Sequence, residues 1–197
     1  MNYFLTSGRL GFRHWNAEDK SLAIGLWCDP QVTALIGSPW TREDALARLA
    51  QEIELDEQYG VQYWPVFLRD DGRHVGCAGL RPYMPEERIL EMGIHLRPAF
   101  WNSGFAREAA QAVMSYGFDA LGAEALFAGH HPRNEASRRL VGKLGFVYWR
   151  DQLYPPTGLM HPTYLFRKSQ PSKLHDQPVK KGSGPVAGSQ WGHRDET

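Results

Sequence analysis

The chain has 197 residues, and 42% of them are hydrophobic, which is enough for one domain with an ordinary buried core. Its 22 basic and 22 acidic residues give a formal net charge of zero, so no overall field attracts nucleic acid or an anionic membrane, and we expect neither as a partner. The N-terminus lacks the features of a signal peptide, and no uncharged apolar stretch approaches the roughly 20 residues of a membrane span, so we expect a cytoplasmic protein.

The first 60 residues predict a strand followed by two helices. Apolar and polar residues alternate over 9–15, which is the period of a half-buried strand. Asn16 has the side chain to cap a first helix, which stops at Pro30. Thr41 begins a capping signal for a second helix, and that helix fades before Gly60.

The middle of the chain predicts a hairpin and a further strand. Residues 62–69 and 74–81 are strand-like and flank an Asp-Asp-Gly turn signal. Pro65 lies inside the first of these strands, and proline removes a ladder hydrogen bond. We therefore expect this strand at an edge of the sheet or beside a bulge. Residues 88–97 form the next strand.

The remaining elements alternate between helix and strand. A long helix is expected from about 104 to 121, and a short apolar strand follows over 124–130. Asn134 caps another helix, which a Leu-Gly pair ends, and strands near 146–150 and 161–168 complete the pattern. This order predicts an α/β domain with a mixed central sheet of about seven strands flanked by about four helices.

Residues 169–197 differ in composition from the rest of the chain. They are rich in Gly, Pro, Ser, Lys, Gln and Asp, and Trp191 is their only aromatic residue. Such a segment buries too little apolar surface to offset the entropy of ordering. We expect one domain over residues 1–168 and a disordered C-terminal tail, with partner binding through Trp191 as the alternative for the tail.

The stretch from Glu91 to Ala109 joins a strand to a helix through a loop of small residues. Ser103, Gly104 and Ala106 leave the start of the helix uncluttered, and the first N–H groups of a helix have no partner within it. Together with the positive end of the helix dipole, these groups favour an anion. An ordinary strand-to-helix connection fits the pattern equally well, because neither the P-loop nor the Rossmann glycine pattern is present.

Two motifs in this half of the chain carry more information. The first is Trp-x-x-Gly-x-Ala at 101–106, preceded by Glu-Met-Gly at 91–93. The second is Asn-Glu-Ala-Ser at 134–137, followed by Lys-Leu-Gly-Phe at 143–146. Their character and order resemble the GNAT N-acetyltransferases, in particular the RimJ/RimL-like branch, over about residues 5–168. The resemblance implies the GNAT fold, with acetyl-CoA as cosubstrate and a pair of parallel strands that splay apart.

The same resemblance implies where acetyl-CoA binds. Strands 90–97 and 124–130 would hold the pantetheine arm through backbone groups, and the loop with the helix start would hold the pyrophosphate. Asn134 would contact the cofactor as well as cap its helix, and a plain N-cap is the alternative. The residues implied to bind the cofactor are Ile94, His95, Leu96, Trp101, Asn102, Ser103, Gly104, Phe105, Ala106, Arg107 and Asn134. The candidates for the 3′-phosphate, each with solvated surface as the default, are Arg97, Arg107, Arg133 and Arg138.

Acetyl transfer needs a neutral amine and a thiolate that is protonated or stabilised as it leaves. Ser137 matches a position near the cofactor sulfur in this branch, and Tyr148 and Tyr154 are alternative donors. For the general base, Glu91 and His95 share one face of their strand by two-residue alternation, and an unperturbed histidine titrates near the working pH. A water chain to solvent is the alternative to a side-chain base.

The acceptor is expected to be the N-terminal α-amine of a protein or peptide, with a small-molecule amine as the alternative. Its groove would lie between residues 36–40 and 154–161, which are aromatic and lightly charged and so disfavour polycationic aminoglycosides. A non-catalytic acyl-CoA-binding module is the rival of another class, and a homodimer is compatible with the sequence. No metal is expected, because His130-His131 lacks a third ligand at useful spacing, and the two cysteines are expected to be buried reduced thiols.

Overall fold

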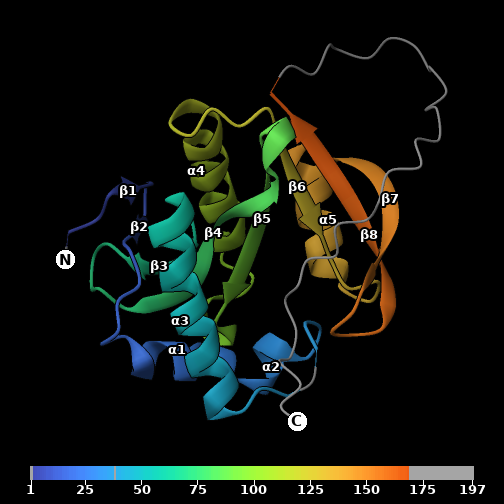
Figure 1. The fold of residues 1–197 in the computed structure, drawn as a ribbon. Coiled ribbons are helices and arrows are strands. Elements are labelled where there is room, and N and C mark those ends of the chain that lie inside the picture. Colours follow the sequence, from blue (N-terminus) through green and yellow to red (C-terminus); the bar gives the residue numbers. More distant parts are fainter. Residues whose placement is uncertain (1, 38, 169–197) are drawn as a thin grey trace, which may run out of the picture.

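An eight-stranded mixed sheet forms the centre of the computed structural model, which describes residues 2–37 and 39–168. Its strands lie in the order β1-β2-β3-β4-β5-β6-β8-β7, and helices cover both faces (Figure 1). The strands are β1 (Leu5–Thr6), β2 (Leu10–Phe12), β3 (Tyr63–Leu68), β4 (His74–Met84), β5 (Ile89–Leu96), β6 (Ala125–Gly129), β7 (Val147–Tyr154) and β8 (Leu159–Arg167). The helices are α1 (Lys20–Trp27), α2 (Pro30–Thr33), α3 (Arg42–Tyr59), α4 (Phe105–Asp119) and α5 (Glu135–Leu144), with short 3-10 helices at Pro85–Glu87 and Pro98–Phe100.

The predicted α/β architecture is confirmed, and β1 and the short α2 are additions to the predicted order. The predicted tail, residues 169–197, lies outside the described residues. No helix in the described ranges combines the length and the apolar composition needed to cross a bilayer.

The helix ends follow local capping chemistry. Thr41 and Asp44 form a capping box, in which the Thr41 hydroxyl accepts from the Asp44 N–H at 3.2 Å and the Asp44 carboxylate accepts from the Thr41 N–H at 2.8 Å. The helix α3 ends at Gly60, whose φ of 67° is left-handed. The Asn134 side-chain oxygen caps α5 by accepting from the Ser137 N–H at 3.0 Å. These three predictions are confirmed.

The predicted cap at Asn16 is wrong, because α1 begins only at Lys20. The Asn16 side chain accepts from the Glu18 N–H at 2.9 Å, which closes a turn instead of a helix. The carboxylate of Asp19 is held by Arg13 through two bonds of 2.6 Å and by the Asn16 N–H at 3.0 Å. This partly buried ion pair holds the turn in place ahead of the helix.

The predicted edge position of the proline strand is also wrong, because β3 lies between β2 and β4. The expected bulge is present, between Val66 and Phe67. The ladder with β2 ends at the pair Phe12–Val66, and the carbonyl of Pro65 accepts from the Arg13 N–H at 3.4 Å just beyond it. Proline is tolerated in this inner strand because its missing N–H falls where β2 has already ended.

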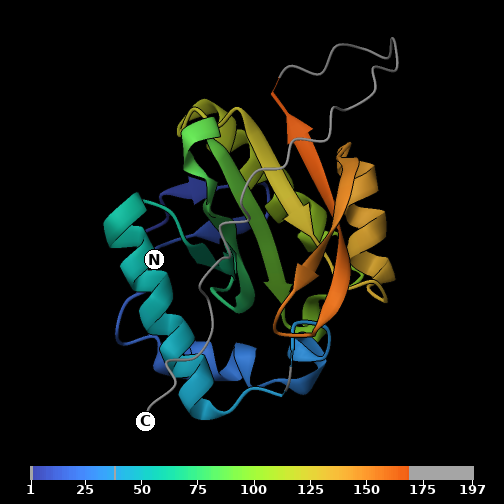
Figure 2. The same ribbon diagram turned by 45° about the vertical axis from the view of Figure 1, so that its right-hand side comes forward.

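Helices α4 and α5 pack on one face of the sheet, and α1 and α3 pack on the other (Figure 2). Successive residues of a strand point to opposite faces. On β3, for example, Trp64 belongs to the core under α4, whereas its neighbour Tyr63 belongs to the core under α1 and α3.

The strands β5 and β6 are parallel and pair at only three positions, from Ile89–Ala125 to Glu91–Phe127. Beyond Glu91, β5 continues along β4 to Leu96, while β6 continues along β8. The predicted splayed pair is therefore confirmed, and its opening begins at Glu91.

Candidate active site

One wall of the opening is the free edge of β5. The Arg97 N–H donates to the carbonyl of Val75 on β4 at 2.9 Å, which shows which backbone groups of β5 face β4. Because backbone groups alternate along a strand, His95 also directs its N–H and C=O toward β4. Ile94 and Leu96 direct theirs into the opening, in agreement with what the resemblance implied for them. The resemblance also implied a cofactor contact for His95, and the backbone groups of His95 do not face the opening.

The other wall is β6, where the same argument applies. The His130 N–H donates to the Pro162 carbonyl on β8 at 3.3 Å, so the backbone groups of Gly129 face β5 across the opening. On the first wall, the Leu96 carbonyl already accepts from the Trp101 indole N–H at 2.7 Å. The Leu96 N–H and the groups of Ile94 and Gly129 remain to bond a ligand in the slot.

The loop after β5 ends in a left-handed residue that opens α4. Gly104 is the N-cap, with φ of 82°, and no side chain caps the helix. Trp101, Asn102 and Ser103 are exposed beside it. The first N–H groups of α4, which begins at Phe105, therefore have no side-chain cap, and the anion site at this point stays a prediction.

A carboxylate one turn into α4 ties this loop to the N-terminal strands. Glu108 accepts from the Ser7 hydroxyl, the Arg9 N–H and the Arg9 Nε, each at 2.7 Å. Arg9 also donates to the Ser103 carbonyl at 3.2 Å. Glu108 thus positions the loop, and Arg9 offsets the negative charge of this carboxylate near the anion site.

The start of α5 places Asn134 and Ser137 together. The Asn134 side-chain oxygen is used by the Ser137 N–H, so only its NH₂ group is left to donate to a cofactor. Both residues are partly buried. Just before them, the His130 ring stacks on Tyr164 at 5.4 Å, and its Nε2 lies 3.3 Å from the Tyr164 hydroxyl.

The opposite face of the sheet holds a buried charged cluster that sequence analysis did not identify. Glu52 of α3 is fully buried, and its carboxylate accepts from Arg48 Nε at 2.9 Å, Arg81 Nη2 at 2.6 Å and the Tyr63 N–H at 2.9 Å. A buried charge is stable only with such partners. The available signal was helical spacing, since Glu52 lies three residues after the buried Leu49.

Glu91 lies beside this cluster, at the point where the strands part. Burial raises the pKa of Glu91, while the charges of Arg81 and Arg48 and a hydrogen bond from Tyr63 act in the opposite direction. The Tyr63 ring crosses Gly93 so closely that a Cβ there would lie 2.1 Å from Tyr63 Cζ. The glycine of the Glu-Met-Gly motif therefore makes room for the Tyr63 ring. Burial raises the pKa of Tyr63 well above its ordinary value, so its hydroxyl stays protonated.

His95 does not have the role that the sequence suggested. Its Nδ1 lies 3.2 Å from the Trp27 indole nitrogen, which can only donate, so Nδ1 accepts and the proton is on Nε2. Burial and the charges of Arg48 and Arg81 lower the pKa of His95 to about 3. The expectation that His95 titrates near the working pH is wrong, because burial and the two guanidinium charges all disfavour the charged ring.

Tyr154 reaches the same environment from the end of β7. Its ring packs on His161 with centroids 4.7 Å apart. Burial raises the pKa of Tyr154, and the charges of Arg48 and Glu91 also act on it. Glu91 and Tyr154 thus lie within electrostatic range of each other, whereas Ser137 lies on α5, at the other face of the sheet.

The two segments expected to border the acceptor also meet. A Cβ on Gly37 would lie 3.6 Å from Pro156, which joins the segment before α3 to the β7–β8 turn. Tyr148, the other alternative donor, is 55% exposed on the edge strand β7. Arg97 packs against α1, where a Cβ on Gly25 would lie 2.2 Å from its Nη2. We therefore remove Arg97 from the candidates for the 3′-phosphate.

Both cysteines are free thiols, with Cys77 buried and Cys28 partly buried. Within residues 2–37 and 39–168, no three His, Cys, Asp or Glu side chains gather as a metal site requires.

Comparison with known proteins defines the class. Residues 9–147 match the model of the acetyltransferase (GNAT) domain. The chain is 31% identical over 145 residues to the uncharacterized N-acetyltransferase YoaA of Bacillus subtilis, covering 72% of this chain and 81% of that protein. The protein belongs to the GNAT acetyltransferase family.

Solved structures agree with this assignment. A GNAT-family acetyltransferase from Bacillus anthracis superposes with a TM-score of 0.68 at 25% identity, covering 82% of this chain and 95% of that chain. RimL, a ribosomal L7/L12 alpha-N-protein acetyltransferase solved in complex with coenzyme A, gives 0.70 at 14% identity, covering 82% and 95%. The likeness to RimL is one of fold.

Proposed function

We propose that this acetyltransferase carries the acetyl group of acetyl-CoA to a primary amine, with the N-terminal α-amine of a protein or peptide as the first acceptor class. The observation that carries the proposal is the slot between β5 and β6, which opens at the carboxylate of Glu91. A small-molecule amine is the alternative acceptor, and it is favoured by the partly buried positions of Glu91 and Tyr154. We keep a cytoplasmic location as part of this proposal.

In this proposal, the chain's groups act from two faces of the sheet. The backbone of Ile94 and Leu96 holds the pantetheine arm, and the loop 101–107 with Asn134 holds the phosphate end. Glu91 accepts the amine proton directly or through water. Ser137 donates to the departing thiolate, and Tyr154 is the second donor.

A homodimer remains part of the proposal. The edge strand β7 supports it, because Val147, Tyr148 and Leu153 are between 55% and 57% exposed there.

The direct test is release of coenzyme A from acetyl-CoA in the presence of a panel of amines and N-terminal peptides. We expect turnover with at least one acceptor. Binding of acetyl-CoA without turnover on any acceptor would instead support a non-catalytic acyl-CoA-binding module.

Gly104→Val is expected to weaken acetyl-CoA binding by about 2 kcal/mol or more while the domain stays folded. A β-branched residue does not adopt a φ of 82°, so the backbone that presents the first N–H groups of α4 must change. Calorimetric titration measures the affinity. The matched control is Gly60→Val, which imposes similar strain (φ 67°) at the end of α3 and should leave affinity unchanged. Equal affinities for Gly104→Val and the parent would remove the loop from the site.

Ser137→Ala is expected to lower kcat about tenfold to a thousandfold, with the Kd for acetyl-CoA within about threefold of the parent. The hydroxyl donor matters most when negative charge develops on the sulfur, so the ground state uses it little. Ser115→Ala, at an exposed position of α4, is the control for the same substitution in a helix. If Ser137→Ala turns over like the parent, the donor is water or Tyr154, and Tyr154→Phe decides between them.

A further inference from the structure

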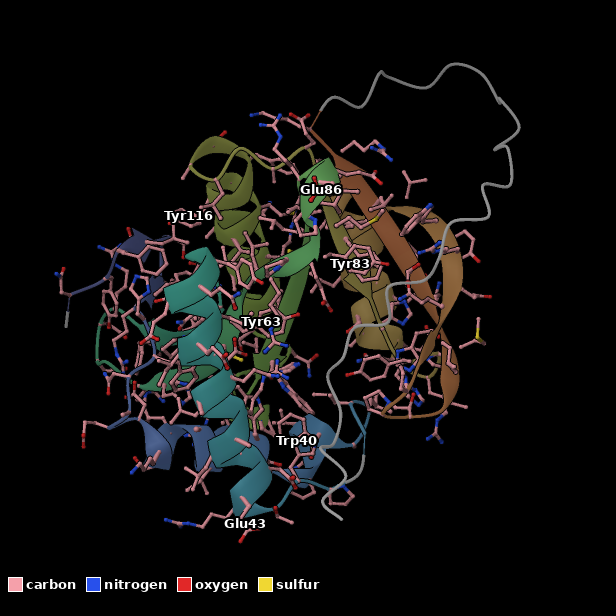
Figure 3. All side chains as sticks on the ribbon, viewed as in Figure 1. Trp40, Glu43, Tyr63, Tyr83, Glu86 and Tyr116 are labelled. Atoms are coloured by element: carbon pink, nitrogen blue, oxygen red, sulfur yellow. The ribbon has the colours of Figure 1, made fainter. Side chains whose placement is uncertain are left out.

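The side chain of Arg48 is enclosed by aromatic rings beside the proposed active site. Its guanidinium carbon lies 5.4 Å from the centroid of the Tyr63 ring, 5.6 Å from that of Trp27 and 5.9 Å from that of Trp40. These rings come from β3, α1 and the segment before α3. In Figure 3, Tyr63 and Trp40 both lie beside α3, on its side toward β5 and the β7–β8 hairpin. Arginine is the cation best suited to such stacking.

Arg48 has N–H donors beyond the one that binds Glu52. An arginine carries five N–H donors, and in Arg48 the Nε donates to Glu52 at 2.9 Å. Within the part of the chain that the structure describes, the two terminal nitrogens of Arg48 bond to no other side chain or carbonyl. The side chain keeps 14% of its surface exposed, so these donors are not sealed inside the core.

The position of Arg48 relates it to the acceptor. Its charge lowers the pKa of both Glu91 on β5 and Tyr154 on β7, so Arg48 lies within electrostatic range of the proposed base and of the β7–β8 hairpin. Trp40, which stacks near it, belongs to the segment that meets the β7–β8 turn. An amine that approaches Glu91 from this side passes Arg48.

The charges of the cluster indicate which charged groups a ligand at this place would carry. Two guanidinium groups, Arg48 and Arg81, face two carboxylates, Glu52 and Glu91. Glu52 is already bound inside the protein, because its two oxygens accept from three donors. Glu91 is then the carboxylate that can interact with the amine. An acceptor that carries only positive charge would be repelled by the Arg48 guanidinium. An acceptor that also brings a carboxylate would satisfy the terminal donors of Arg48 in the bidentate manner that arginine favours.

We propose that Arg48 binds a carboxylate of the acceptor, so that the substrate is a primary amine with a carboxylate a few bonds away. The inference rests on the proposed acetyltransferase function and names its substrate class. Two sources share this chemistry: the α-carboxylate of a free amino acid, and an acidic side chain at the start of a peptide.

Matched acceptor pairs test the proposal in the full-length protein. The first pair is L-methionine and L-methioninamide, and the second is two short peptides that differ only by Asp or Asn at the first position. We expect kcat/KM to favour the carboxylate member of at least one pair by about tenfold or more, mainly through KM. The amine of the amide is less basic and so more often neutral, which biases the first pair against the proposal. The pair with the larger ratio identifies the source of the carboxylate.

Variants of Arg48 connect the preference to this residue. Arg48→Gln should bring the kcat/KM ratio toward one by raising KM for the carboxylate member. Arg48→Lys should keep part of the preference, and it serves as the test if the glutamine variant fails to fold. Arg42→Gln, at the exposed start of α3, should keep the parent's ratio. Equal kcat/KM within both pairs for the parent, or an undiminished ratio in a folded Arg48 variant, would overturn the proposal.

Calorimetric binding of the same compounds to the coenzyme A complex separates this inference from the proposed function. Preferred binding of the carboxylate member without turnover of any acceptor would support the Arg48 site and contradict acetyl transfer. Turnover with equal binding of both members would support acetyl transfer and contradict the Arg48 site.

Discussion

Glu91→Gln is expected to lower kcat by about 10²-fold or more, because the amine proton loses its acceptor at the opening of the slot. Glutamine keeps the size and the hydrogen-bonding capacity of the side chain, so the change removes mainly the basic group. Steady-state release of coenzyme A with a good acceptor measures the effect. Glu54→Gln, at an exposed position of α3, is the control and should turn over like the parent.

If Glu91 is the base, the direction of the pH dependence of kcat/KM can also be predicted. A base must be ionised to act, and burial raises the pKa of Glu91 above its ordinary value. Activity should therefore fall as the pH drops through this raised pKa, and the acidic limb of kcat/KM should lie above the ordinary glutamate value of about 4.3. His95, with a pKa of about 3, stays neutral through this range and does not produce the limb.

Tyr63→Phe should move that limb to higher pH. The hydrogen bond from Tyr63 lowers the pKa of Glu91 in the parent, so its loss lets the pKa rise further. A limb that stays in place in both Glu91→Gln and Tyr63→Phe would show that a water chain, and not Glu91, takes the proton.

Glu52→Ala is expected to destabilise the domain by about 3–5 kcal/mol, which is a large share of the stability of an ordinary domain. The change leaves two guanidinium groups without their buried carboxylate, Arg48 at 14% and Arg81 at 8% exposure, and removes the acceptor of the Tyr63 N–H. Urea unfolding followed by circular dichroism measures the free energy of unfolding.

The control for this change is Glu124→Ala. Glu124 also pairs with an arginine, Arg88, but the two side chains are 53% and 63% exposed. Exposed pairs contribute about 0–1 kcal/mol, so the control should unfold nearly like the parent. If both variants lose the same small amount, the buried cluster does not hold α3 on the sheet.

Local signals in the sequence predicted most of the elements and their order. The capping pair at Thr41, the left-handed Gly104 and the N-cap Asn134 act within one helical turn, so their effect is visible without the rest of the fold. The splayed strand pair came from the resemblance of the two motifs, and the structure confirms it.

The buried charged cluster around Glu52 was decided by tertiary structure. In the sequence, Glu52 and Arg48 resemble ordinary polar residues of a surface helix. They lie beside Arg81 because α3 packs on β3 and β4. The same docking lowers the pKa of His95 and raises that of Glu91, since both shifts depend on burial and on charges from other elements. Pro65 could be placed only once β2 was seen to end before it. Such effects arise between residues far apart in the chain, where sequence spacing carries no information about distance or burial.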